Sequence, residues 1–188
     1  MSITLSQALW PVQSQTRARR AAMLVLLGSA LLAASAHLAV PFYPVPMTLQ
    51  TAVVLGLGMA YGWRLGVLTV AVYLMQGALG LPVFSGGVGM AHLTGATGGY
   101  LLGFLPAVAI TGHLAQRGWD RSLGGTAAAM VLGNAAIYAL GLVGLGMVLG
   151  WDKPIVSLGL TPFVAGDLLK IALVTLALPA VWRLLGQR

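Results

Sequence analysis

Apolar residues fill six long stretches of the chain, and short polar, glycine-rich or proline-rich segments separate them. The stretches cover about residues 21–40, 48–62, 65–81, 97–116, 124–149 and 162–182. The longer ones reach the roughly 20 residues that a helix needs to cross the hydrocarbon core of a bilayer. The pattern predicts an all-α integral membrane protein with six transmembrane helices. They form a single domain, residues 21–188, after a tail of residues 1–20.

Two uncharged loops interrupt this pattern on the same side of the predicted bundle. Residues 41–47 contain three prolines, which stop a helix by removing a backbone donor and fixing φ. Residues 82–96 contain the glycine-rich run Ser85-Gly86-Gly87-Val88-Gly89. Elsewhere a tight turn is expected at Arg64. We expect the two loops to cover one end of the helix bundle.

The composition supports membrane insertion and excludes several other classes. Of the 188 residues, 59% are hydrophobic and 7% are charged, whereas a soluble domain is about 25% charged. The net charge of +7 does not indicate nucleic-acid binding, because the basic residues lie between apolar stretches and form no patch. The chain has no cysteine and its three histidines are scattered, so no metal site is predicted.

The charged residues also predict the orientation. Six spans put both termini on one side, and that side receives every arginine, whereas the other side receives Lys153 next to Asp152. Because cytoplasmic loops are rich in lysine and arginine, both termini are expected in the cytoplasm. One alternative is a signal peptide, with arginines, an apolar run and then Ala34-Ser35-Ala36. The run is longer than a usual signal core, and further spans follow it.

One acid and one base lie inside the last apolar stretch. Asp167 and Lys170 are three residues apart, so they share one face of a helix. Ionisable groups at membrane depth are costly and usually face a cavity, a partner or a substrate. In the predicted orientation, nearly every other polar side chain that could bind a ligand also lies in the outer half. The predicted binding residues are Asp167, Lys170, Asn134, Tyr138, Gln50, Tyr73, Gln76, Phe84, Ser85 and Tyr100. They predict a ligand cup in the outer half of the membrane, under the two extracytoplasmic loops.

Structural roles remain open for the same residues. The Asp167–Lys170 pair can join two helices, and Asn134 can form an interhelical hydrogen bond. Each tyrosine can be an interface residue. Ser85-Gly86 near His92 faintly resembles an intramembrane serine protease, but the glycine expected two positions before the serine is replaced by Val83. There is no G-x-x-x-x-G-K-[ST] motif, so no nucleotide site is predicted.

Five stretches taken together resemble the BioY family, the biotin-specific substrate-binding (S) components of energy-coupling-factor (ECF) vitamin transporters. They follow the family's order and span about residues 20–185. One departure is Ala96, where the family usually has proline. The stretches are Val45-Pro46-Met47-Thr48-Leu49-Gln50, Gly80-Leu81-Pro82-Val83-Phe84, Thr97-Gly98-Gly99-Tyr100-Leu101 with Gly103-Phe104, Gly133-Asn134 with Ile137-Tyr138, and Pro162-Phe163 with Gly166-Asp167 and Lys170.

The resemblance implies a transport subunit of a bacterial cytoplasmic (inner) membrane that captures biotin from outside, and it implies neither an enzyme nor a cofactor. It also implies a transmembrane coupling protein and two cytoplasmic ATPase subunits as partners. Small residues of the first helix would meet the coupling protein, and the candidates are Ala30 and Ala34, or Ala18 and Ala22.

Biotin chemistry fits the polar residues. Asp167 can accept a ureido N–H, Asn134 can donate and accept, and Lys170 can donate to the ureido oxygen or to the carboxylate. Three alternatives stay open: a capture subunit for another small vitamin or anion, a structural subunit whose polar pair only joins helices, and an intramembrane enzyme.

Overall fold

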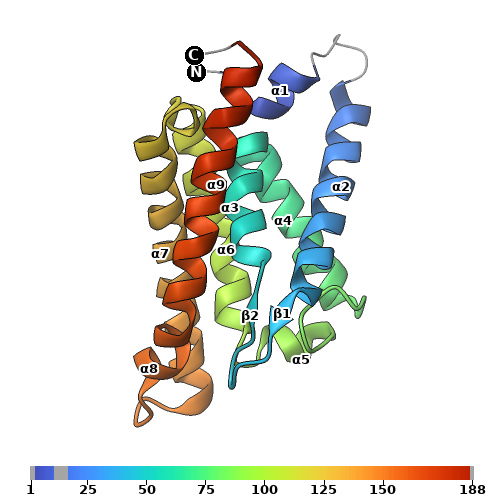
Figure 1. The fold of residues 1–188 in the computed structure, drawn as a ribbon. Helices are drawn as coiled ribbons and strands as arrows, with labels where there is room; N and C mark the ends of the chain where they lie inside the picture. Colours follow the sequence, from blue (N-terminus) through green and yellow to red (C-terminus); the bar gives the residue numbers. More distant parts are fainter. Residues whose placement is uncertain (1–2, 11–16, 187–188) are drawn as a thin grey trace.

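The computed structural model describes residues 3–10 and 17–186. Long helices run side by side in a bundle, and α1 and the C-terminal end of α9 lie at the same end of it (Figure 1). A two-stranded hairpin and the short helices α5 and α8 lie at the opposite end. In chain order the elements are α1 (Leu5–Leu9), α2 (Arg17–His37), β1 (Ala39–Val40), β2 (Met47–Thr48), α3 (Gln50–Tyr61), α4 (Trp63–Ala78), α5 (Gly89–Leu93), α6 (Gly98–Ala115), η2 (Trp119–Arg121), α7 (Leu123–Leu149), α8 (Ile155–Gly159), η3 (Thr161–Phe163) and α9 (Val164–Leu184).

Six of these helices occupy the six apolar stretches, with two notable shifts. Helix α2 begins at Arg17 and ends at His37, because the chain beyond it pairs as a strand. The turn between the second and third stretches lies at Gly62 and not at Arg64, which is inside α4. Gly62 has φ +79°, a left-handed conformation that favours glycine, and it ends α3 while starting α4.

Four segments of the described chain are long and apolar enough to cross a membrane: Arg17–His37, Gly98–Ala115, Leu123–Leu149 and Ile155–Leu184. Helix α3 has only 12 residues, or about 18 Å at 1.5 Å per residue. None of its residues is exposed. Helices α1, α2, α4, α6, α7 and α9 all contact it, so protein surrounds it on several sides.

The hairpin continues the path of α3 toward the end of the bundle. Its strands β1 and β2 are antiparallel, with Ala39 opposite Thr48 and Val40 opposite Met47. The prolines of residues 41–47 were expected to form an irregular loop, and the strand pairing on either side of it was not foreseen. Non-helical backbone is tolerated at membrane depth where it is buried in protein or lines a cavity. Residues 45–48 of the hairpin meet that condition, since they line the cavity described below.

Helices α6 and α7 pack closely against each other. A Cβ atom on Gly99 would lie 2.4 Å from the Leu140 carbonyl oxygen, and one on Gly103 would lie 2.9 Å from the Ile137 Cα. Across the same contact, Gly141 leaves room for the Tyr100 ring, which a Cβ there would meet at 2.3 Å. Small residues let helix backbones approach each other in a membrane. The glycines therefore bring α7 close enough to α6 for their side chains to share one cavity.

The two ends of the bundle differ in charge. The arginines of the described chain (Arg17, Arg19, Arg20, Arg64, Arg117, Arg121 and Arg183) lie at or near helix ends on the side of α1. On that side Asp120 is buried and accepts a 2.6 Å hydrogen bond from the Trp182 indole, which links η2 to α9. Burial raises the pKa of the Asp120 carboxyl. At the opposite end, the exposed Lys153 pairs with Asp152 at 3.1 Å.

Gly77 provides a test of the packing between α4 and the loop that follows it. A Cβ on this residue would lie 2.0 Å from the Phe84 ring, whereas a Cβ on Gly56 in α3 meets nothing within 4 Å. Gly77→Ala is therefore expected to destabilise the protein by about 1–3 kcal/mol through overpacking. Gly56→Ala, the matched control, is expected to stabilise it by about 0.5–1 kcal/mol. Thermal unfolding in detergent measures both, and equal shifts would contradict the packing argument.

Candidate ligand-binding site

The site is built around the acid–base pair of α9. Asp167 and Lys170 are both buried, and the Lys170 Nζ lies 2.9 Å from the Asp167 Oδ1. They are one helical turn apart, which allows this contact. A buried ion pair needs further hydrogen bonds to offset the loss of hydration of its two charges.

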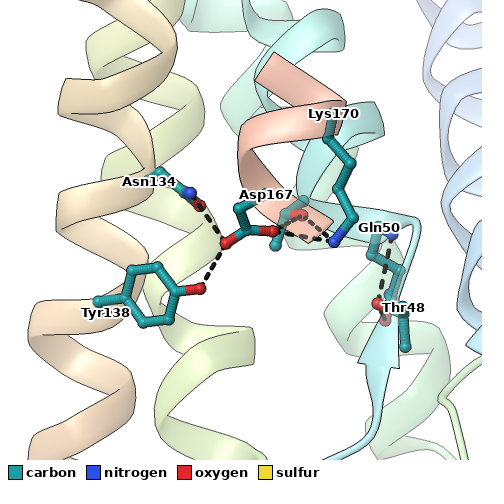
Figure 2. Close-up of polar contacts among 7 residues, drawn as sticks. Thr48, Gln50, Asn134, Tyr138, Asp167 and Lys170 are labelled. Carbon is teal, nitrogen blue, oxygen red and sulfur yellow. Dashed lines mark hydrogen bonds and ion pairs between the residues drawn. The ribbon is translucent and has the colours of Figure 1, made fainter. Parts of the chain in front are cut away.

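Neighbouring helices supply those hydrogen bonds, as Figure 2 shows. On α7, the Asn134 Nδ2 donates to the Asp167 Oδ2 at 2.9 Å, and the Tyr138 hydroxyl donates to the same oxygen. On α3, the Thr51 hydroxyl lies 3.3 Å from the Asp167 Oδ1 and 3.1 Å from the Lys170 Nζ. An ionised carboxylate has about four acceptor positions. The four donors to Asp167, which come from α3, α7 and α9 itself, therefore fill all of these positions.

Gln50 forms a second polar chain beside this pair. Its Nε2 donates to the Tyr73 hydroxyl at 2.6 Å, and that hydroxyl donates to the Val83 carbonyl at 2.9 Å. Its Oε1 accepts from the Thr48 hydroxyl at 3.2 Å. The first residue of α3 is thereby fixed to the hairpin, to α4 and to the loop after α4.

His92 of α5 provides an aromatic and polar surface on the loop side. Its ring stacks on Phe84 with centroids 5.4 Å apart, and its Nε2 shares a 3.0 Å hydrogen bond with the Thr97 hydroxyl. Burial lowers the pKa of the His92 imidazole from its ordinary value of 6.5. The neutral ring is therefore favoured at neutral pH.

A narrow cavity lies between these groups. Its wall comes from α3, α6, α7, α9 and Phe163 of η3, from hairpin residues 45–48, and from Ser85, His92 and Thr97. Aromatic and aliphatic side chains form most of the wall, and Asp167, Lys170, Gln50 and Thr51 provide polar groups. The cavity is partly open and has a volume of about 60 Å³. The arrangement suits a small ligand with an apolar body and a few polar atoms that both donate and accept hydrogen bonds.

The sequence places the chain in a known family. The BioY family model matches residues 7–187. The chain belongs to the BioY family. It is 38% identical over 149 residues to the biotin transporter BioY of Thermotoga maritima, covering 79% of this chain and 87% of that protein. It is 35% identical over 158 residues to the biotin transporter BioY2 of Lactococcus lactis, covering 81% of this chain and 85% of that protein.

The fold also matches that of a solved structure. The crystal structure of the S-component for biotin from an ECF-type ABC transporter superposes with a TM-score of 0.75, covering 94% of this chain and 96% of that chain, at 22% identity. Together with the apolar helices, the transporter relatives indicate that this BioY-family chain is a multi-pass membrane protein. Its relatives are transporters and not enzymes.

The structure brings six of the ten predicted binding residues of this BioY-family chain to the wall of one cavity. They come from four elements and one loop, although the chain separates Gln50 from Lys170 by most of its length. The six are Gln50, Ser85, Tyr100, Tyr138, Asp167 and Lys170. Their position around one cavity agrees with the predicted site. Their role in binding a ligand stays a prediction.

The other four predicted residues do not line the cavity. Tyr73 is fully buried behind Gln50, and Phe84 is buried between Tyr73 and the His92 ring, so both support residues at or near the wall. Asn134 lies behind the pair and donates to Asp167. Gln76 accepts a hydrogen bond from Ser29, which directs it toward α2 and away from the pair.

Several lining residues were not among the predicted ones. Thr51 is the most informative, because it contacts both charged atoms of the pair. The sequence feature that could have identified Thr51 is its place next to the predicted binding residue Gln50, in the run Thr48-Leu49-Gln50-Thr51. His92, noted in the sequence for its nearness to Ser85-Gly86, also lines the cavity.

Proposed function

We propose that this chain captures biotin and takes part in its uptake, as the substrate-specific subunit of an ECF-type transporter. One observation carries the proposal beyond family membership. A buried acid–base pair, held by donors from two other helices, opens into a cavity with a mainly apolar wall. Biotin offers matching groups: a ureido ring with two N–H donors and one carbonyl, an apolar bicycle and chain, and a carboxylate.

The pair can recognise the ureido ring by exchange of hydrogen bonds. Since four donors already surround Asp167, a ligand N–H binds there only by replacing one of them. Tyr138 is the best placed to yield, because its ring lines the cavity and its hydroxyl can rotate to a ligand acceptor. Lys170 carries protons that can turn to a ligand carbonyl. Charge-assisted bonds of this kind are stronger than neutral ones in a dry cavity.

The charge asymmetry supports an orientation with the cavity outward. The arginines are at one end of the bundle, and the exposed Lys153 at the other end is paired with Asp152. By the positive-inside rule, we propose six crossings, cytoplasmic termini and a cytoplasmic-membrane location. Helices α3 and α4, shorter than a full span, would form two of the crossings together with the hairpin and the loop beside them.

Energy for uptake is proposed to come from other chains. A transmembrane coupling protein with two ATPase subunits would complete the transporter. Ala18, Ala22, Ala30 and Ala34 are exposed on α2 at multiples of four residues. Residues spaced by four share a helix face and, being small, permit close approach of another helix. One of the two pairs, Ala30 with Ala34 or Ala18 with Ala22, is the proposed contact for the coupling protein.

Calorimetric titration with biotin tests the proposed function. The full chain, purified in a neutral detergent and monodisperse, is expected to bind one biotin with a Kd in the nanomolar range, or about −12 kcal/mol. A panel of other vitamins, added as competitors, is the control for specificity. Absence of biotin binding by folded protein would overturn the proposal, and tight binding of another vitamin would identify a different ligand for the same cavity.

A further inference from the structure

Two arginines of α2 face α1 across a cleft at the end of the bundle remote from the ligand cavity. Arg17 and Arg20 are three residues apart and so share one face of α2. Gln7 and Trp10 of the α1 segment complete the described lining of this cleft. The Arg20 Nη2 donates to the Ser6 carbonyl, which ties α2 to α1, while the Arg20 Nε is buried without a hydrogen-bond partner in the described chain.

No acidic side chain of the protein balances these two charges. The sequence contains only three acidic residues. Asp152 pairs with Lys153, Asp167 pairs with Lys170, and Asp120 is buried with its Oδ2 on the Trp182 indole. The first turn of α2 also contains no acid, so the positive end of the helix dipole adds to the arginine charges. An anion from outside the chain is therefore favoured at this position.

We propose that the cleft between α1 and α2 binds the phosphate group of an anionic phospholipid through Arg17 and Arg20. Guanidinium groups suit phosphate because their N–H donors form paired hydrogen bonds with its oxygens. Each basic residue near an anionic membrane surface contributes about 1 kcal/mol of attraction. The buried Arg20 Nε provides one donor that the described residues leave unused.

The surroundings of the cleft favour a lipid over a soluble anion. Helix α2 is long and apolar enough to cross the membrane, so its first turn lies at headgroup depth. Leu9 and Trp10 are exposed apolar side chains beside the cleft, and tryptophan is enriched at this depth of a bilayer. Leu5 is buried against the bundle, which holds α1 in place. The acyl chains of a bound lipid would thus meet an apolar surface next to the two arginines.

Native mass spectrometry of the full chain tests this site. Protein in neutral detergent is incubated with phosphatidylglycerol or with phosphatidylcholine that has the same acyl chains. We expect preferential retention of phosphatidylglycerol and, for Arg17→Gln, at least about fivefold weaker retention, since one arginine is worth about 1 kcal/mol. Arg17 has no hydrogen bond within the described chain, so its loss is expected to leave folding intact. The double variant Arg17→Gln/Arg20→Gln should retain least.

Arg183→Gln is the matched control, because Arg183 is an exposed arginine at the same end of the bundle. It should retain phosphatidylglycerol as the unchanged protein does. Equal retention of the two lipids, or an equal loss in Arg183→Gln, would overturn the proposal. A further arm measures thermal stabilisation by phosphatidylglycerol and by inorganic phosphate alone. Stabilisation by phosphate that matches the lipid would also overturn it, since a soluble anion would then be sufficient.

Discussion

Replacing Asp167 with alanine is expected to weaken biotin binding at least about tenfold, or 1.4 kcal/mol. The change removes the acceptor for a ligand N–H and leaves Lys170 buried without its counter-charge. It also leaves the donors of Thr51, Asn134 and Tyr138 without their shared acceptor. Calorimetric titration of the purified variant measures the change in Kd.

Asp152→Ala is the matched control for this measurement. Asp152 is an exposed acid paired with an exposed lysine, and it does not line the cavity. Its removal is expected to leave the affinity for biotin unchanged. If a folded Asp167→Ala protein bound biotin as tightly as the unchanged protein, the site assignment would be wrong, and the pair would be left with the helix-joining role that the sequence also allows.

Removal of the lysine should have the largest effect on stability. Lys170→Met leaves the Asp167 carboxylate buried without a cation, and breaking a buried ion pair in this way costs about 3–5 kcal/mol. The double variant Asp167→Asn/Lys170→Met removes both charges and should recover much of that loss. Thermal unfolding in detergent provides the comparison. Biotin binding should remain weak in both variants, which separates recognition from stability.

Lys153→Met is the control for this second prediction. Its partner Asp152 is exposed, so the loss is expected to stay within about 1 kcal/mol. A similar loss in Lys153→Met and Lys170→Met would contradict the importance of burial. Full biotin affinity in the double variant would instead support a purely structural pair.

The helices could be predicted from the sequence because hydropathy and helix breakers act locally. Apolar stretches located six helices, and the spacing of Asp167 and Lys170 allowed their contact. The boundaries were less predictable. A glycine in the left-handed conformation at position 62 made the turn that Arg64 was expected to mark. Strand pairing around the prolines of residues 41–47 depends on contacts that the proline pattern alone does not specify.

The rotation of each helix about its own axis explains why only some of the predicted binding residues line the cavity. Tyr73 and Gln76 are both on α4, yet Tyr73 bonds to Gln50 and Gln76 to Ser29 on α2. Hydropathy does not show which neighbouring helix a polar side chain of α4 faces, because both α3 and α2 offer it a hydrogen-bond partner. Thr51 was missed because a threonine in a helix often bonds to its own backbone. Its role depends on α9 packing against α3, a contact between distant parts of the sequence.

The small volume of the cavity has a kinetic consequence. At about 60 Å³, it is well below the roughly 300–1,000 Å³ of most ligand pockets. A ligand with two fused rings therefore requires this cavity to widen, and hairpin residues 45–48 with Ser85 and His92 form the part of its wall that lies outside the long helices. Association gated by such a motion is slower than the usual 10⁵–10⁷ M⁻¹s⁻¹ of unhindered encounters. Tight binding of the proposed ligand would therefore be reached by slow release, so that a captured ligand would stay long enough for a later transport step.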